Sequence, residues 1–121
     1  ATASIAFPED MIQKFEKARR MKGGTRFLHV FATCPTGWRI PSEMSVKIAR
    51  LAVQSNVFPL YEVTDGVDYT INIKGYRPAS DYLKVQGRFK HLTDEDFEQI
   101  QNMVDEDWGV LLLKTSRSQK S

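Results

Sequence analysis

The sequence lacks several features that define specialised protein classes. It has a single cysteine, Cys34, so a domain held together by intrachain disulfides is excluded. No apolar run approaches the ~20 residues of a transmembrane helix. Glycine and proline number only 7 and 5 in 121 residues, which excludes collagen and low-complexity disorder. The chain does not begin with a basic and apolar secretion leader. We therefore expect a cytoplasmic protein with no membrane partner.

The chain also lacks a large excess of either positive or negative charge. The chain has 17 basic and 15 acidic residues, and this net charge of +2 argues against nucleic acid as a partner. The charges are unevenly distributed, with nine bases and four acids in residues 1–50 and eight bases and eleven acids in residues 51–121. Residues 94–107 hold seven of these acids and no base. Such a run is typical of a solvated helix face.

The first half of the chain predicts alternating helices and strands. Pro8, followed by two acids, favours a helix that starts there and ends at the glycine pair 23–24. Residues 26–33 form a nearly continuous apolar run, which is typical of a strand covered on both faces. Ser42 is expected to cap a further helix that ends near residues 55–56. This order indicates an α/β fold.

The second half has a different character. Residues 57–63 and 67–73 are strand-like and flank a Thr-Asp-Gly segment at 64–66, which predicts a β-hairpin. We therefore expect two regions. Residues 1–56 form strand and helix units of an α/β domain, and residues 57–121 form a hairpin and helical C-terminal extension.

A last helix is predicted over residues 94–108. Thr93 and Asp96 have the spacing of a capping box, although aspartate reaches back less well than glutamate. Gly109 follows this helix, and the polar tail 114–121 is expected to fray.

Cys34 is the candidate functional residue because of its position. It follows the predicted strand and opens a turn-rich segment, residues 34–41, and ligands gather at the carboxyl edge of open α/β sheets. A lone cysteine is more often a small buried apolar residue. A nucleophilic cysteine needs a histidine base, but His29 is interpreted as a core histidine and nothing pairs His91 with Cys34. Metal sites need about four ligands, so Cys34 could supply only one.

Four segments carry a resemblance to a known family. They are FLHVFATCPTGW at 27–38, FPLYE at 58–62, ATASIAFPED at 1–10 and LKVQGRFKHL at 83–92. Together they resemble the C-terminal part of the β subunit of 2-oxoacid:ferredoxin oxidoreductases, the thiamine-diphosphate-binding subunit, of the pyruvate:ferredoxin oxidoreductase type. The CPTGW and PLYE segments are the most specific.

The resemblance implies a fold and an activity. The fold is the C-terminal portion of a doubly wound, thiamine-diphosphate-binding α/β sheet with a β-hairpin and a C-terminal helix appended. The activity is oxidative decarboxylation of a 2-oxoacid, pyruvate foremost, to acyl-CoA and CO2, with electrons passing through 4Fe–4S clusters to ferredoxin. The implied partners are the other subunits, ferredoxin, coenzyme A and the 2-oxoacid.

The resemblance also implies a role for one residue. Cys34 matches the fourth cysteine ligand of a 4Fe–4S cluster whose other ligands lie upstream in the family. Gly37 is expected to allow close backbone approach, and Trp38 either shields the cluster or simply packs. The chain has no Gly-Asp-Gly diphosphate motif and no Cys-x-x-Cys. Thiamine diphosphate and Mg²⁺ are therefore expected to bind mainly to other segments, and no catalytic or cofactor-binding residue is assigned. The alternative is a non-catalytic α/β interaction or assembly subunit with a buried structural cysteine.

Overall fold

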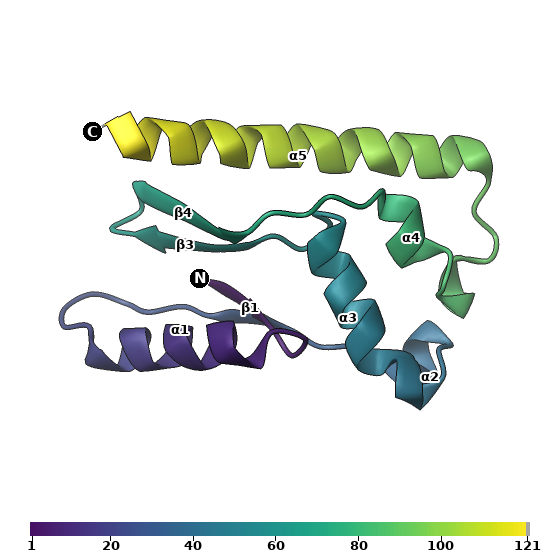
Figure 1. Cartoon of the computed structure of the whole chain (residues 1–121), viewed down its shortest axis with the longest axis horizontal. Coiled ribbons are helices and arrows are strands. Elements are labelled where there is room, and N and C mark those ends of the chain that lie inside the picture. Colours follow the sequence, from purple (N-terminus) through teal and green to yellow (C-terminus); the bar gives the residue numbers. More distant parts are fainter. Residues whose placement is uncertain (121) are drawn as a thin grey trace.

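The computed structural model describes residues 1–120, which fold into mixed helices and strands (Figure 1). The first half contains β1 (Thr2–Ser4), α1 (Pro8–Arg20), β2 (His29–Phe31), α2 (Pro35–Trp38), η1 (Ser42–Met44) and α3 (Ser45–Gln54). The second half contains β3 (Leu60–Thr64), β4 (Asp68–Ile73), α4 (Ala79–Leu83), η2 (Gly87–Phe89) and α5 (Asp94–Lys120). None of these helices is both long and apolar enough to cross a lipid bilayer.

The strands form two small sheets of different kinds. β1 and β2 pair in parallel, with Thr2 opposite His29, and α1 makes the crossover that a parallel pair requires. β3 and β4 pair antiparallel as the predicted hairpin. Asp65 and Gly66 at its turn have positive φ angles of 54° and 73°, the backbone that an Asp-Gly turn favours. The predicted α/β fold and hairpin are therefore confirmed.

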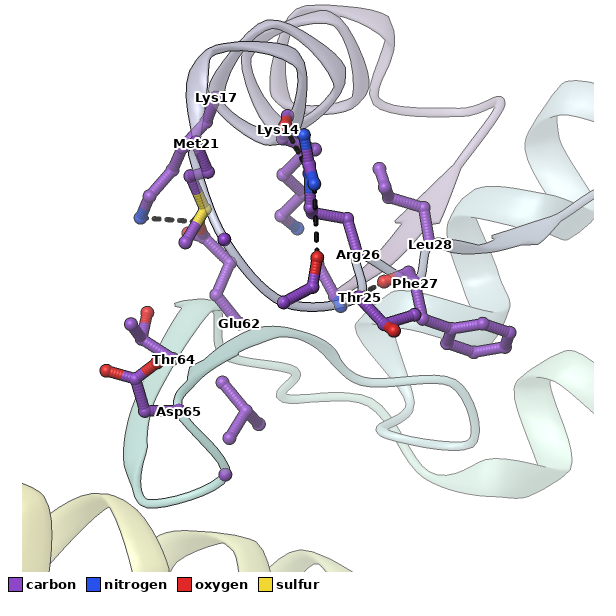
Figure 2. A pocket seen from close by; sticks show the side chains of 16 residues that line it. Lys14, Lys17, Met21, Thr25, Arg26, Phe27, Leu28, Glu62, Thr64 and Asp65 are labelled. Carbon is purple, nitrogen blue, oxygen red and sulfur yellow. Dashed lines mark hydrogen bonds and ion pairs between the residues drawn. The ribbon is translucent and has the colours of Figure 1, made fainter.

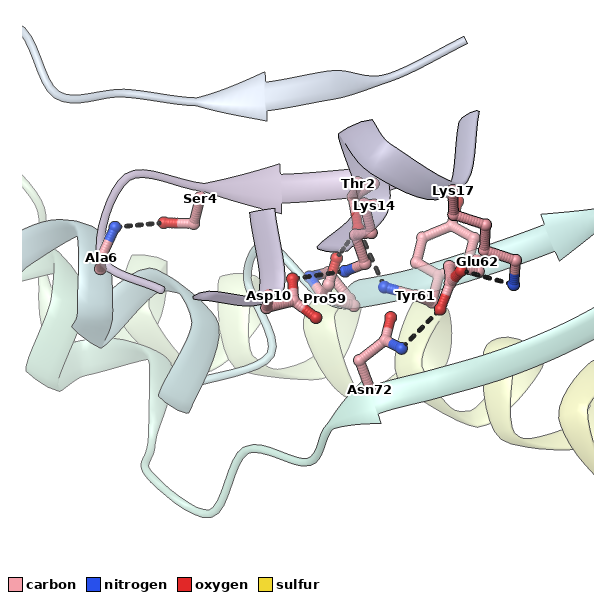
Figure 3. Close-up of polar contacts among 10 residues, drawn as sticks. All are labelled: Thr2, Ser4, Ala6, Asp10, Lys14, Lys17, Pro59, Tyr61, Glu62 and Asn72. Carbon is pink, nitrogen blue, oxygen red and sulfur yellow. Dashed lines mark hydrogen bonds and ion pairs between the residues drawn. The ribbon is translucent and has the colours of Figure 1, made fainter. Parts of the chain in front are cut away.

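One hydrophobic core joins the two halves of the chain. Its buried side chains come from α3, α4 and the segment before η1: Ile40, Ile48, Leu51, Ala52, Ala79, Tyr82 and Leu83. A second connection is polar, because the Thr2 hydroxyl donates to the Pro59 carbonyl oxygen at 2.6 Å and accepts from the Tyr61 amide at 3.0 Å (Figure 3). Contacts thus cross between regions 1–56 and 57–121, and the division into these regions stays a prediction.

One ion pair connects α1 to the hairpin, and a second lies within α1. The Lys14 ammonium is buried and pairs with Asp10 at 2.6 Å, while Lys17 pairs with Glu62 on β3 at 2.9 Å (Figure 3). Partial burial favours the protonated form of Glu62. Hydrogen bonds from Asn72 and Lys17 outweigh this effect and lower the pKa of Glu62. The network therefore favours the ionised carboxylate at the helix–hairpin contact.

The strand predicted at residues 26–33 is wrong in length and in burial. β2 spans only His29–Phe31, and Phe27 and Val30 are 74% and 37% exposed. A strand covered on both faces needs neighbours, but within residues 1–120 β2 pairs only with β1. His29 is exposed too, with its ring edge-to-face on Phe58 at 5.3 Å, so its interpretation as a core histidine is wrong.

The last helix is longer than the sequence pattern predicts. α5 continues through Gly109 to the last described residue, so the predicted end at residue 108 and the predicted fraying are wrong, while Ser121 lies outside the described residues. Glycine costs about 1 kcal/mol in a helix interior. The second half of α5 packs on the hairpin: Leu111 is buried, and the Ser118 hydroxyl accepts a 2.8 Å hydrogen bond from the β4 backbone. These tertiary contacts explain why the helix continues past the glycine.

The two predicted helix caps have different outcomes. At the start of α5, the Thr93 amide donates to Asp96 Oδ2 at 2.8 Å and the Asp96 amide donates to Thr93 Oγ1 at 3.2 Å, so the capping box is confirmed. Ser42 does not cap a helix through its side chain. It begins the 3₁₀ turn η1 instead, and α3 starts three residues later.

The capping box predicts the titration of Asp96. Backbone and hydroxyl hydrogen bonds from Thr93 lower the pKa of Asp96 from its ordinary 3.8. The box is therefore fully formed above pH 3.8 and is lost as the pH falls through the lower pKa of the folded state. We expect carboxyl NMR shifts of Asp96 to give a midpoint below 3.8, and Thr93→Val to raise it. A wild-type midpoint at or above 3.8 would contradict the box.

Candidate functional site at the Cys34 turn

The chain makes one helical turn directly after β2. Cys34 is the N-cap residue of α2 and Pro35 takes the first helical position, where its fixed φ suits a helix. The Trp38 amide donates to the Cys34 carbonyl oxygen at 2.9 Å. Arg39 then adopts a left-handed backbone with φ of 53°, which ends the turn. The loop predicted at residues 34–41 is therefore wrong in part, because its first half is a closed helical turn.

The Cys34 side chain is exposed, so the interpretation as a small buried apolar residue is wrong. Gly37 lies against the sulfur on the same turn. A Cβ atom at this position would come within 3.3 Å of Cys34 Sγ, which is tighter than an ordinary contact. The glycine therefore leaves one side of the thiol free of a neighbouring side chain.

A positive charge is fixed beside this turn. The Arg88 guanidinium carbon lies 3.9 Å from the centre of the Trp38 ring. Arg88 Nε donates to Gln86 Oε1 at 2.8 Å, and its Nη2 donates to the Tyr82 hydroxyl at 3.3 Å. The arginine is thus held by a ring face and two hydrogen bonds, a geometry that favours guanidinium over ammonium. Trp38 therefore packs against a cation, while a role in shielding a cluster stays a prediction.

The segment η2 docks on the end of the turn through a glycine. The Gly87 amide donates to the Arg39 carbonyl oxygen at 3.1 Å. A Cβ atom on Gly87 would lie 2.6 Å from Arg39 Cβ and 2.8 Å from its carbonyl oxygen. No side chain fits this close approach without backbone movement. Gly87 therefore allows the segment that carries Arg88 to reach the Cys34 turn.

The donor set limits what this site can hold. Within residues 1–120 no group of three or more histidine, cysteine, aspartate or glutamate side chains could hold a metal ion. A thiolate is the soft ligand that iron–sulfur clusters use, and these clusters need about four such ligands. The exposed sulfur of Cys34, with its open side over Gly37, fits the part of one ligand in a site shared with other segments.

A pocket lies elsewhere in the molecule. It has a volume of about 360 Å³ and lies between α1, the segment that leads to β2, and the hairpin (Figure 2). Three of its charged side chains are held within the fold: Lys17 bonds Glu62, and Arg26 donates to the Ala18 and Gly24 carbonyl oxygens at 3.1 Å each. Cys34 is not among its lining residues, so this pocket and the Cys34 turn are separate features.

The amino-acid sequence is similar to subunits of several oxidoreductases. The chain is 51% identical over 115 residues to ketoisovalerate oxidoreductase subunit VorB of Pyrococcus furiosus, a match that covers 92% of this chain. It is 45% identical over 113 residues to pyruvate synthase subunit PorB of Methanocaldococcus jannaschii, again over 92% of this chain. The chain is homologous to the β subunits of 2-oxoacid:ferredoxin oxidoreductases. No family model matches it.

The homology covers only part of these β subunits. The chain spans 36% of the Pyrococcus relative and 37% of the Methanocaldococcus relative. A third relative, the β subunit of the NADH-dependent phenylglyoxylate dehydrogenase of Aromatoleum evansii, is 45% identical over 107 residues, which are 86% of this chain and 24% of the relative. The names of these relatives thus refer to three different 2-oxoacids.

Sequence reasoning identified Cys34 and Gly37 but missed the second half of the site. Gly87 and Arg88 lie in the LKVQGRFKHL segment, which contributed to the resemblance without an assigned role. The only signal in the sequence is that Gly87 is followed by Arg88 and an aromatic residue. This local pattern does not indicate that Arg88 contacts Trp38. The homology to these β subunits extends over both halves of the site.

Proposed function

We propose that the chain is part of a 2-oxoacid:ferredoxin oxidoreductase that converts a 2-oxoacid and coenzyme A to acyl-CoA and CO2, with ferredoxin as the electron acceptor. Pyruvate is the first candidate substrate. The observation that carries the proposal is the 45–51% identity to oxidoreductase subunits over nearly the whole chain. The other subunits of the same enzyme are its partners.

Cys34 is assigned as one ligand of a 4Fe–4S cluster in this proposal. Such a cluster supplies one-electron chemistry when it is bound. The exposed thiolate of Cys34 provides the sulfur, and Gly37 leaves room for iron to approach it. The guanidinium of Arg88, stacked on Trp38, places a fixed positive charge beside the turn, and a nearby cation favours the reduced form of a cluster. Thiamine diphosphate and Mg²⁺ are assigned mainly to segments outside residues 1–121.

The names of two relatives support a second candidate substrate and a second candidate electron acceptor. The Pyrococcus relative at 51% identity is named for ketoisovalerate, so 2-oxoisovalerate is the second candidate. The Aromatoleum relative is named as NADH-dependent, which makes NAD⁺ the second candidate for the electron acceptor. A non-catalytic assembly subunit is less well supported, because that reading required a buried structural cysteine and Cys34 is exposed.

The experiment that tests the proposal is a substrate panel on the full-length protein, purified anaerobically with the subunits that accompany it. Pyruvate, 2-oxoisovalerate and phenylglyoxylate are each supplied with coenzyme A and either ferredoxin or NAD⁺. We expect the fastest reduction of ferredoxin with pyruvate, and none when coenzyme A is omitted. A faster rate with 2-oxoisovalerate would change the assigned substrate. No 2-oxoacid-dependent reduction of either acceptor would reject the function.

A further inference from the structure

The half-buried cation Arg88 has no counter-ion among the side chains of residues 1–119. Its guanidinium carbon lies 3.9 Å from the centre of the Trp38 ring and 4.5 Å from the centre of the Phe89 ring, so two aromatic rings flank the charge. The ion pairs formed within the described chain do not include Arg88. A charge that is partly removed from water is costly unless an opposite charge offsets it. Arg88 therefore favours an anion from outside the described residues.

Buried groups hold this cation in place. Arg88 Nε donates to Gln86 Oε1 at 2.8 Å, and Nη2 donates to the Tyr82 hydroxyl at 3.3 Å. Gln86 and Tyr82 are 1% and 4% exposed, and Gln86 Nε2 donates in turn to the Tyr82 carbonyl oxygen at 2.7 Å. These bonds use two of the five N–H donors of the guanidinium. The charge is thus fixed to the core, and its other donors are left for an anion.

The turn next to Arg88 is the one that carries the candidate ligand Cys34. Trp38, on which Arg88 stacks, lies four residues after Cys34, and its amide donates to the Cys34 carbonyl oxygen at 2.9 Å. Residues four apart are neighbours on a helical turn. A 4Fe–4S cluster with four thiolate ligands carries a net negative charge, and this charge is one of the quantities that set its reduction potential. The proposed cluster is therefore an anion of the kind that Arg88 lacks.

We propose that Arg88 supplies the fixed counter-charge of the cluster assigned to Cys34 and raises its reduction potential. This inference rests on the function proposed above. Reduction by one electron, released in the oxidation of the 2-oxoacid and later passed to ferredoxin, adds one negative charge to the cluster. The guanidinium favours this more negative, reduced form. Because the cation is partly buried between two rings, water and salt screen it less than they screen a surface lysine.

A redox titration of the full-length enzyme with its accompanying subunits, followed by electron paramagnetic resonance, tests this role. The signal that belongs to the cluster at Cys34 is the one that Cys34→Ala removes or alters. Arg88→Gln removes the positive charge and keeps a side chain that can donate hydrogen bonds. We expect the ratio of reduced to oxidised cluster at a fixed potential to fall about tenfold, which corresponds to about 59 mV for one electron.

Two control variants separate the charge from other effects. Arg88→Lys keeps the positive charge and should keep the ratio within about threefold of the wild type. Lys90→Gln removes a charge from the same segment, but Lys90 is exposed, so the ratio should change by less than about twofold. An unchanged ratio in Arg88→Gln, or a change that Arg88→Lys or Lys90→Gln produces to the same extent, would overturn the proposal.

The iron and acid-labile sulfide contents distinguish this inference from the proposed function. We expect Arg88→Gln to keep the wild-type contents, because Arg88 is not a ligand. Loss of the cluster in this variant would mean that Arg88 only supports the structure of the turn. That result would overturn the counter-charge role and leave Cys34 as a ligand. An unchanged signal in Cys34→Ala would instead reject the cluster assignment, and this inference with it.

Discussion

The Cys34→Ala variant of the full-length enzyme is expected to lose more than about 100-fold of its 2-oxoacid-dependent ferredoxin reduction. Changes to residues that only support a metal ligand cost about 10–100-fold, and the loss of a ligand should cost more. The thiol is exposed and lies at the protein surface of the described chain, so its removal leaves no buried cavity. Folding should therefore be preserved while activity falls. Turnover with saturating 2-oxoacid and coenzyme A is the measurement.

Thr36→Ser is the matched control for the cysteine variant. Thr36 is exposed on the same helical turn, and serine retains its hydroxyl. We expect this variant to keep the activity of the wild type. If Cys34→Ala also keeps it to within about threefold, the electron path does not depend on this residue and the assignment fails.

The second large effect is expected at Gly87, where a side chain has no room. Gly87→Ala pushes its Cβ into Arg39, at 2.6 Å from Cβ and 2.8 Å from the carbonyl oxygen. Overpacking of this kind costs about 1–3 kcal/mol, and here the neighbour includes backbone that cannot rotate away. We expect the urea-unfolding midpoint to fall accordingly. Because Arg39 ends the Cys34 turn, the same substitution should also weaken the binding of the iron–sulfur cluster that we propose at that turn.

Gly109→Ala is the control, because it should change the stability in the opposite direction. A Cβ atom at Gly109 meets nothing within 4 Å, and the residue lies inside α5. Alanine should therefore raise the stability by about 1 kcal/mol through helix propensity alone. If the two substitutions change the unfolding midpoint in the same direction, the close contact between Gly87 and Arg39 is not what constrains position 87.

Local chemistry determined which elements could be predicted from the sequence. Pro8 and the two acids after it start α1, and the Asp-Gly pair at 65–66 forms the hairpin turn, because each signal acts within a few residues. The length of β2 depends on which strands pair with it. The apolar run at residues 26–33 does not indicate how many strands those are. α5 passes Gly109 because of its contacts with the hairpin, which lies far away in the sequence.

The same distinction applies to the candidate site. Cys34 and Gly37 could be singled out because they follow a strand and share one turn. The contact between Trp38 and Arg88 could not, because it forms only when η2 docks on that turn through Gly87. Residues that act through tertiary contact carry no periodic or motif signal of their own. The structure was needed to find them.

The central claim is that the Cys34 sulfur binds iron. Iron and acid-labile sulfide are measured in the anaerobically purified full-length enzyme and in its Cys34→Ala variant, with electron paramagnetic resonance of the reduced samples. The account predicts that the variant has lost or altered one 4Fe–4S cluster, with up to about four iron and four sulfide fewer per chain and a changed reduced-state signal. Equal iron, equal sulfide and an unchanged signal would contradict it.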